Sequence, residues 1–300
     1  MKKIECYDVG GTKIRAALIE QRADGKDFNI VHLTEEKSFG GNFSILVEKI
    51  HKISECLRKN ETKPDAVSLG FPGPILGDLL INAPPLKISK TINIRKKLEE
   101  KFETDKIFLG NDLNLAAKAE LVYGEGKKTK NFYLLGIGTG IGVGIIINGE
   151  VLQNSCGEFG HDTLERDTKL ANKCLCGRKG CWVAMASGYG IHEIIKKIGI
   201  KNIKYFFKRA EKGEERIDLI LERIRDYNAQ GIGNMLNAFS LDKIIVMGSV
   251  GLRQFEKIIP SKRSIEKYTI NRVPEIKPTK LKEDIGIVGA YVHALESLGK

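Results

Sequence analysis

A cluster of three cysteines and one histidine constrains this chain more than any other stretch of its sequence. His161 is followed after thirteen positions by Cys174, then by Cys176 and, past a Gly-Arg-Lys-Gly turn, by Cys181. Three thiolates and one imidazole are the ligands of a closed, tetrahedral structural zinc site. The alternatives are disulfides or unrelated core cysteines, but Cys174 and Cys176 are too close for an easy mutual disulfide. We therefore predict that these four residues bind Zn²⁺.

A metal at this cluster would order a loop that has little apolar content of its own. Gly177 and Gly180 permit the sharp turns that bring the later cysteines onto one ion. Glu158 lies three positions before His161, so the same ion would hold its carboxylate in place. Structural zinc contributes about 10–16 kcal/mol in small peptides at neutral pH, and a fraction of that would order this loop. We interpret the cluster as a clamp that aims Glu158 and His161 at a ligand.

The bulk properties exclude several classes of protein. A length of 300 residues, 42% of them hydrophobic, predicts a globular chain of about two domains. The longest apolar run, near residues 143–147, is too short to span a bilayer, and the first residues lack the apolar block of a signal peptide. The three other cysteines, Cys6, Cys56 and Cys156, are scattered, which favours a reducing cytoplasm.

The net charge of +11 raises the possibility of a nucleic-acid partner. The basic residues, however, are mixed with acids along predicted helices, and no basic run is interleaved with aromatic residues. We therefore expect a lysine-rich surface, and neither a nucleic acid nor a membrane as partner.

Two glycine turns join pairs of predicted strands, one in each half of the chain. The first is the Gly-Gly-Thr-Lys turn of residues 10–13, and the second is Gly138-Thr139-Gly140. The N–H groups of such a turn suit phosphate oxygens, and Asp8 could hold a hydrated Mg²⁺ beside them. Either turn alone would be only a hairpin. The pair suggests a duplicated fold that binds a nucleotide, with a later strand ending at Gly248 and Ser249 as a wall for the adenine.

Two further turns follow predicted buried strands. Residues 72–74 form a Pro-Gly-Pro turn in which the backbone at Gly73 can approach a ligand. Gly110-Asn111-Asp112 ends the next strand and begins a helix, the position at which open α/β sheets bind ligands. An Asp at that position is by default the helix N-cap, so a functional role for Asp112 needs other support.

These motifs together resemble the ROK family of sugar kinases, within the actin-like ATPase superfamily. The segments that carry the resemblance span nearly the whole chain and occur in family order: DVGGTK, GFPGP, GNDLN, GIGTGIGVG, GEFGH, CLCGRKGC, VMGSVG and GIVGAY. The resemblance implies a two-domain, ribonuclease H-like α/β fold with the active site in the interdomain cleft. We expect an N-terminal α/β domain at residues 1–112, with the C-terminal helix 286–300 packed back on it, and a larger α/β domain at residues 113–285.

The resemblance also implies an ATP-dependent hexose kinase. Asp112 would be the general base, and Gly73, Asn111, Glu158 and His161 would bind the sugar. ATP and Mg²⁺ would be held by Asp8, Gly10, Gly11, Thr12, Lys13, Gly138, Thr139, Gly140, Gly248 and Ser249, and structural Zn²⁺ by His161, Cys174, Cys176 and Cys181. Family members are also expected to form homodimers or homotetramers.

The sequence departs from the family pattern at two positions where a sugar contact is usual. Val183 replaces a glutamate two positions after the last zinc cysteine, and Pro85 replaces an asparagine. Loss of one buried polar partner costs about 1–3 kcal/mol. These departures leave the identity of the sugar open, so N-acetylated hexoses are candidates beside glucose.

Two other functions remain as alternatives. The family includes transcription repressors, but those carry a helix-turn-helix before the first glycine turn, and only seven residues precede Asp8 here. A non-catalytic sugar-binding regulator or scaffold is the second alternative, suggested by Val183 and Pro85.

Overall fold

Two units make up the chain in the computed structural model, which describes residues 2–25, 27–58, 63–102, 104–152 and 157–299. Unit 1 comprises Met1–Gly124, Val151–Cys156 and Asp284–Lys300, and unit 2 comprises Glu125–Glu150 and Gly157–Glu283. The contacts group the helix that begins at Asp112 with unit 1 as far as Gly124, whereas the sequence predicts the boundary between residues 112 and 113. Cys156 lies outside the described residues.

The main sheet of unit 1 has the strand order β3-β2-β1-β4-β8. β1 pairs antiparallel with β2, whereas β1, β4 and β8 are mutually parallel. Asp8 pairs with Gly70 and Gly70 with Gly110, so the carboxyl ends of the three parallel strands meet at one edge. The strands are β1 (Lys3–Val9), β2 (Lys13–Gln21), β3 (Phe28–Lys37), β4 (Ala66–Phe71) and β8 (Ile107–Asn111), with a small second sheet of β5 (Ile75–Leu76), β6 (Leu79–Leu80) and β7 (Ile92–Asn93).

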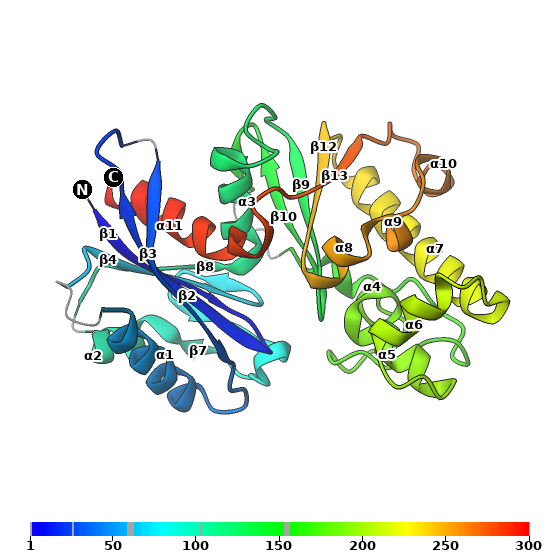
Figure 1. The fold of residues 1–300 in the computed structure, drawn as a ribbon, viewed down its shortest axis with the longest axis horizontal. Coiled ribbons are helices and arrows are strands. Elements are labelled where there is room, and N and C mark those ends of the chain that lie inside the picture. The colour runs from blue at the N-terminus through cyan, green and yellow to red at the C-terminus, as the bar shows by residue number, and fades with distance from the viewer. Residues whose placement is uncertain (1, 26, 59–62, 103, 153–156, 300) are drawn as a thin grey trace. The chain divides into compact units, whose positions relative to one another are not determined.

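Helices cover both faces of the main sheet of unit 1 (Figure 1). α1 and α2 pack together on one face, where the apolar residues of α1 recur at helical spacing and are buried. α3 and α11 lie on the other face. Glycine at position 289 permits their close approach, because a Cβ there would lie only 2.1 Å from the Leu115 carbonyl oxygen. The helices are α1 (Phe43–Arg58), the short 3-10 helix η1 (Pro84–Leu86), α2 (Ile94–Phe102), α3 (Asp112–Tyr123) and α11 (Ile285–Leu298).

The sheet of unit 2 has the order β11-β10-β9-β12-β13 and repeats the pattern of a hairpin joined to parallel strands. β9 and β10 form the antiparallel hairpin, and β12 lies parallel to both β9 and β13. β9 is buried throughout, as its apolar sequence predicts for a strand with neighbours on both sides. The strands are β9 (Phe132–Ile137), β10 (Ile141–Ile147), β11 (Glu150–Val151), β12 (Lys243–Met247) and β13 (Glu275–Pro278).

Most helices of unit 2 follow the cysteine-rich loop and pack around the long helix α7 (Figure 1). No helix among the described residues has the length and apolar character needed to cross a membrane. The helices are η2 (Glu158–His161), α4 (Trp182–Ala186), α5 (Gly188–Lys197), α6 (Ile203–Ala210), α7 (Glu215–Ala238), α8 (Ser249–Arg253), α9 (Phe255–Ile258), α10 (Lys262–Ile265) and η3 (Lys282–Asp284).

A buried carboxylate links β1 to α1 within unit 1. Glu5 is fully buried and accepts hydrogen bonds from the Tyr7 hydroxyl at 2.7 Å and the Ser54 hydroxyl at 2.8 Å. The Arg58 guanidinium donates to its other oxygen at 2.5 Å. Because a buried charge is tolerated only when it is paired, this network holds α1 against the strand that carries Asp8.

We predict that Arg58→Ala lowers the free energy of unfolding by about 1–3 kcal/mol, because it leaves Glu5 without its cationic partner; the value is below that of a fully buried pair because water can reach Arg58. The shift in the urea midpoint measures it. Arg22→Ala is the control, since Arg22 pairs with Asp27 at the surface and should change stability by less than about 0.5 kcal/mol. Equal shifts in the two variants would refute a role for the network.

Candidate active site

Several residues predicted to bind substrates meet at the carboxyl edge of the unit 1 sheet. Asp8 is the penultimate residue of β1, Asn111 is the last residue of the parallel strand β8, and Asp112 follows it. Burial raises the pKa of Asp8, although the nearby Lys13 and Arg15 charges oppose the shift. A Cβ on Gly286 would lie 2.4 Å from Asp8 Oδ2, so the start of α11 forms one wall beside this carboxylate. Sequence reasoning missed Gly286.

Asn111, and not Asp112, is the N-cap of α3. Its side-chain oxygen accepts hydrogen bonds from the backbone N–H groups of Leu113 and Asn114, both at 3.1 Å. Asp112 is the first helical residue, and its Oδ1 accepts a hydrogen bond from Leu113 N at 2.8 Å. The default capping role that the sequence suggested for Asp112 therefore belongs to its neighbour.

Asn111 also joins β8 to the Pro-Gly-Pro turn that follows β4. Its side-chain nitrogen donates to the Gly73 carbonyl oxygen at 3.1 Å. Gly73 has φ +97°, and a Cβ there would lie 2.0 Å from the Asn82 carbonyl oxygen, so only glycine fits this turn. The turn predicted from the sequence is thus held beside Asp112 by Asn111, which remains a predicted sugar contact.

The tip of the β1–β2 hairpin packs against the segment that contains Pro85. Gly10 N donates to the Lys13 carbonyl at 2.9 Å, which closes the turn. A Cβ on Gly11 would lie 2.6 Å from the Pro85 carbonyl oxygen. Thr12 is exposed at the tip, whereas the Lys13 ammonium is hydrogen-bonded to Glu35 at 2.7 Å.

The glycine turn of unit 2 occupies the equivalent position on the second sheet. Gly138, Thr139 and Gly140 connect β9 to β10, and a hydrogen bond of 2.9 Å from Gly138 N to Gly140 O closes the turn. Gly248 follows the parallel strand β12, has φ +91°, and would place a Cβ 2.5 Å from the Ile137 carbonyl oxygen. The structure therefore brings the predicted Gly138–Gly140 and Gly248–Ser249 segments together at one edge.

The four predicted zinc ligands converge. The ligand atoms of His161, Cys174, Cys176 and Cys181 all lie within 4.8 Å of one another. Cys176 Sγ is 3.7 Å from Cys181 Sγ, and Cys174 Sγ is 3.5 Å from His161 Nδ1. Around tetrahedral zinc, with bonds of about 2.3 Å to sulfur and about 2.0 Å to nitrogen, these separations should be about 3.8 Å and about 3.5 Å. A disulfide needs sulfurs about 2.05 Å apart, so the spacing fits zinc.

The electrostatics of the cluster also suit a metal. Burial raises the pKa of the Cys176 thiol, but hydrogen bonds with the backbone and side chain of Arg178 outweigh it and bring the pKa to about 7. Burial, followed by the Arg178 charge, lowers the pKa of His161 and favours the neutral imidazole that metals bind. With the metal in place, these residues would hold a closed structural site, leaving no position for a reacting group.

Backbone hydrogen bonds and two left-handed glycines shape the loop around the cluster. Gly177 has φ +93° and Gly180 has φ +71°, as the predicted sharp turns require. A Cβ on Gly180 would lie 1.8 Å from the Glu165 carbonyl oxygen. Asn172, which sequence reasoning missed, is buried. Its backbone carbonyl accepts a hydrogen bond from Gly180 N at 3.0 Å, and its side-chain nitrogen donates to the Ala184 carbonyl oxygen at 2.9 Å. Only its contacts across the loop reveal that role.

Glu158 and His161 share the short helix η2, which lies along β10. Gly157 has φ +64° and Gly160 packs on Ile141, where a Cβ would lie 2.0 Å from the carbonyl oxygen. His161 turns Nδ1 toward Cys174, while its Nε2 is 3.6 Å from Glu158 Oε2. Burial raises the pKa of Glu158 to about 7. A metal bound through Nδ1 would therefore fix the imidazole so that Nε2 faces the glutamate.

Val183 lies in α4, where its side chain is buried and forms an apolar wall near the unit 2 glycine turn. A Cβ on Gly140 would be 3.8 Å from Val183 Cγ2. No polar group from this position can reach a ligand.

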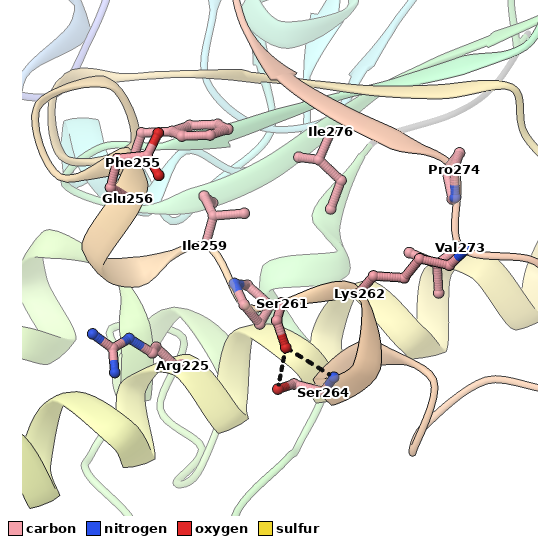
Figure 2. A pocket seen from close by; sticks show the side chains of 11 residues that line it. Arg225, Phe255, Glu256, Ile259, Ser261, Lys262, Ser264, Val273, Pro274 and Ile276 are labelled. Carbon is pink, nitrogen blue, oxygen red and sulfur yellow. Dashed lines mark hydrogen bonds between the residues drawn. The ribbon is translucent and has the colours of Figure 1, made fainter.

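A separate groove of about 610 Å³ lies in unit 2 between α7, α9, α10 and β13 (Figure 2). Its walls include Phe255, Ile259 and Ile276, and none of the residues predicted from the sequence lines it. Val273 and Pro274 precede β13, so the groove lies toward the amino end of that strand, whereas Gly248 follows the carboxyl end of the parallel strand β12. It is distinct from the candidate site.

Comparisons with known proteins agree with this geometry. The ROK family model matches residues 4–297. A glucokinase of Halalkalibacterium halodurans is 28% identical, over 94% of this chain and 92% of its own length. An N-acetylmannosamine kinase of Haemophilus influenzae is 30% identical, also over 94% and 92%. The crystal structure of a ROK family glucokinase from Streptomyces griseus in complex with glucose and AMPPNP superposes with a TM-score of 0.78 at 22% identity, covering 96% of this chain and 97% of that one.

We predict that the purified protein contains one zinc ion per chain by elemental analysis, and that Cys176→Ser loses most of it, because a neutral hydroxyl is a poor replacement for a thiolate. Cys56→Ser is the control, since Cys56 is exposed in α1, outside the cluster. Retention of a full zinc equivalent by Cys176→Ser, or its loss from both variants, would contradict the assigned ligand set.

Proposed function

Because this chain belongs to the ROK family, whose sugar kinases have the actin-like ATPase fold, we propose that it is an ATP-dependent sugar kinase. The reaction would transfer the γ-phosphoryl group of ATP to a hydroxyl, the 6-OH, of a hexose such as glucose or an N-acetylated hexose. Support comes from the glucokinase and the N-acetylmannosamine kinase that resemble it over nearly their full length.

The position of Asp112 carries the proposal. It is the first residue of α3, at the sheet edge where Asp8 and Gly73 also lie, and Asn111 takes over the capping role. Phosphoryl transfer needs little covalent chemistry from the protein beyond a positioned base and the neutralisation of charge. A carboxylate held at a helix N-terminus, beside a turn fixed by Asn111, meets the first need.

The two glycine turns would bind the phosphates of ATP. Thr12 and Thr139 are exposed, and the peptide N–H groups of such turns are donors of the kind that phosphate oxygens accept. Asp8 would hold the Mg²⁺ that neutralises these phosphates, since its carboxylate lies on β1 just before the first turn. Gly248 and Ser249 would form the wall for the adenine.

The proposed reaction combines one phosphoryl transfer to the sugar hydroxyl with one proton transfer from that hydroxyl. The sugar hydroxyl oxygen attacks the γ-phosphorus as the bond to the β-phosphate oxygen breaks, and ADP leaves. Asp112 accepts the hydroxyl proton as the new P–O bond forms. Glu158 and His161 would orient the sugar, with zinc holding their loop in shape.

The sugar is proposed only as a class. Val183 presents an apolar surface where a glutamate would accept a hydrogen bond. Pro85 packs its backbone on Gly11 and lacks the side-chain amide of the asparagine usual at that position. Both features reduce the polar contacts available to a hexose hydroxyl. An N-acetylated hexose is therefore a candidate beside glucose.

We predict that Asp112→Asn lowers kcat by about 10²–10⁴-fold with little change in sugar affinity, because the amide cannot accept the proton. The matched control is Asp105→Asn, an exposed aspartate just before β8, at the opposite end of the same strand. Steady-state kinetics with the best sugar measure both. Full activity of Asp112→Asn would remove it from the role of base.

We predict ATP-dependent ADP release with at least one sugar in a panel of hexoses and N-acetylated hexosamines, measured by a coupled assay with Mg²⁺. The ratio of kcat/KM between N-acetylmannosamine and glucose would rank the two substrate classes. If sugars bind but none is turned over, the alternative of a non-catalytic sugar-binding regulator or scaffold would replace the kinase.

A further inference from the structure

The first turn of α5 is bonded directly to the glycine turn of unit 2. Gly188 N donates to the Gly138 carbonyl oxygen at 2.8 Å, and Tyr189 N donates to the Thr139 carbonyl oxygen at 3.1 Å. The first N–H groups of a helix have no partners within that helix. Here they are satisfied by the two carbonyls of the turn, so α5 holds the turn by its backbone.

These two bonds set the direction of the next two N–H groups. In a trans peptide the carbonyl of one residue and the N–H of the following residue point in opposite directions. Because the carbonyls of Gly138 and Thr139 point toward α5, the N–H groups of Thr139 and Gly140 point away from it. Both residues are exposed, so these donors are accessible to an anion.

The approach of α5 depends on glycine. A Cβ on Gly188 would lie 2.8 Å from the Gly138 carbonyl oxygen, and one on Gly190 would lie 2.6 Å from the carbonyl carbon of Ala184. Glycine is unfavourable within helices, yet two of the first three residues of α5 are glycine. Close contact with the turn and with α4 accounts for both.

Ser187 connects this contact to the cysteine-rich loop. Its hydroxyl is fully buried, accepts from Gly190 N at 3.2 Å as the N-cap of α5, and donates to the Val183 carbonyl oxygen of α4 at 2.5 Å. α4 begins at Trp182, directly after the ligand Cys181. The Trp182 indole N–H donates to Asn228 of α7 at 2.8 Å, which anchors this short helix.

We propose that Ser187 and Gly188 are positioning residues for nucleotide binding. Ser187 caps α5, and Gly188 lets the helix approach so closely that the N–H groups of Gly188 and Tyr189 hold the Gly138 and Thr139 carbonyls. The N–H groups of Thr139 and Gly140 are thereby aimed at the nucleotide phosphates. The inference rests on the proposed kinase function. It extends that function, because a helix outside the predicted motifs positions the turn that would bind ATP. The same segment connects the metal cluster to the nucleotide turn through six residues, 182–187.

Titration of the zinc-loaded protein with AMPPNP and Mg²⁺, by calorimetry, tests the inference. Ser187→Ala and Gly188→Ala should each raise Kd for AMPPNP by about tenfold; in turnover assays KM for ATP should rise similarly while kcat and KM for the sugar stay within about twofold. Ser261→Ala is the matched control, because Ser261 caps α10 with the same 3.2 Å bond, to Ser264 N, away from the turn. It should leave Kd unchanged.

Trp182 is the only tryptophan in the chain, so its fluorescence reports whether α4 stays folded in each variant. An unchanged Kd in both variants with normal Trp182 emission would overturn the inference. So would parallel losses of nucleotide affinity, sugar affinity and Trp182 emission, because they would show that the start of α5 serves the fold alone. Failure of the wild-type protein to bind AMPPNP would instead refute the proposed function.

Discussion

Parallel pairing of β1, β4 and β8 is the constraint on which the candidate site of unit 1 depends. Parallel strands end at the same edge, so residues more than a hundred positions apart in sequence, Asp8 and Asp112, are brought to one place by backbone hydrogen bonds alone. In unit 2, β9 and β12 bring the Gly138 and Gly248 turns together in the same way. Each sheet thus provides an edge, and the loops that follow its strands supply the chemistry.

Hydrogen bonds and close backbone contacts hold the loops at these edges. Asn111 spans α3 and the Gly73 turn, and the start of α5 holds the Gly138 turn. Where two backbones approach this closely, a Cβ would collide with a carbonyl oxygen, as at Gly73 and Gly188. Glycine costs conformational entropy at such positions, and the contact it permits offsets that cost.

In the cysteine-rich loop, the predicted zinc ligands would supply the order that hydrogen bonds supply elsewhere. Its hydrophobic residues Leu170 and Leu175 are exposed, so burial contributes little to its order. The four ligand atoms lie within 4.8 Å of one another, and buried Trp182 and Asn172 attach the loop to the rest of unit 2. A loop ordered in this way can keep polar residues such as Glu158 partly exposed to a ligand.

The sequence by itself determined the element types, the glycine turns and which four residues cluster as predicted zinc ligands, because each depends on local pattern: apolar periodicity, turn residues and short ligand spacing. The fold class that the family resemblance implied is confirmed. Tertiary structure alone decided that Asn111 caps α3, that Gly286 lies beside Asp8 and that Gly188 bonds to the Gly138 carbonyl. These roles depend on contacts between segments distant in sequence or on which of two adjacent residues turns its side chain inward, and no local pattern encodes either.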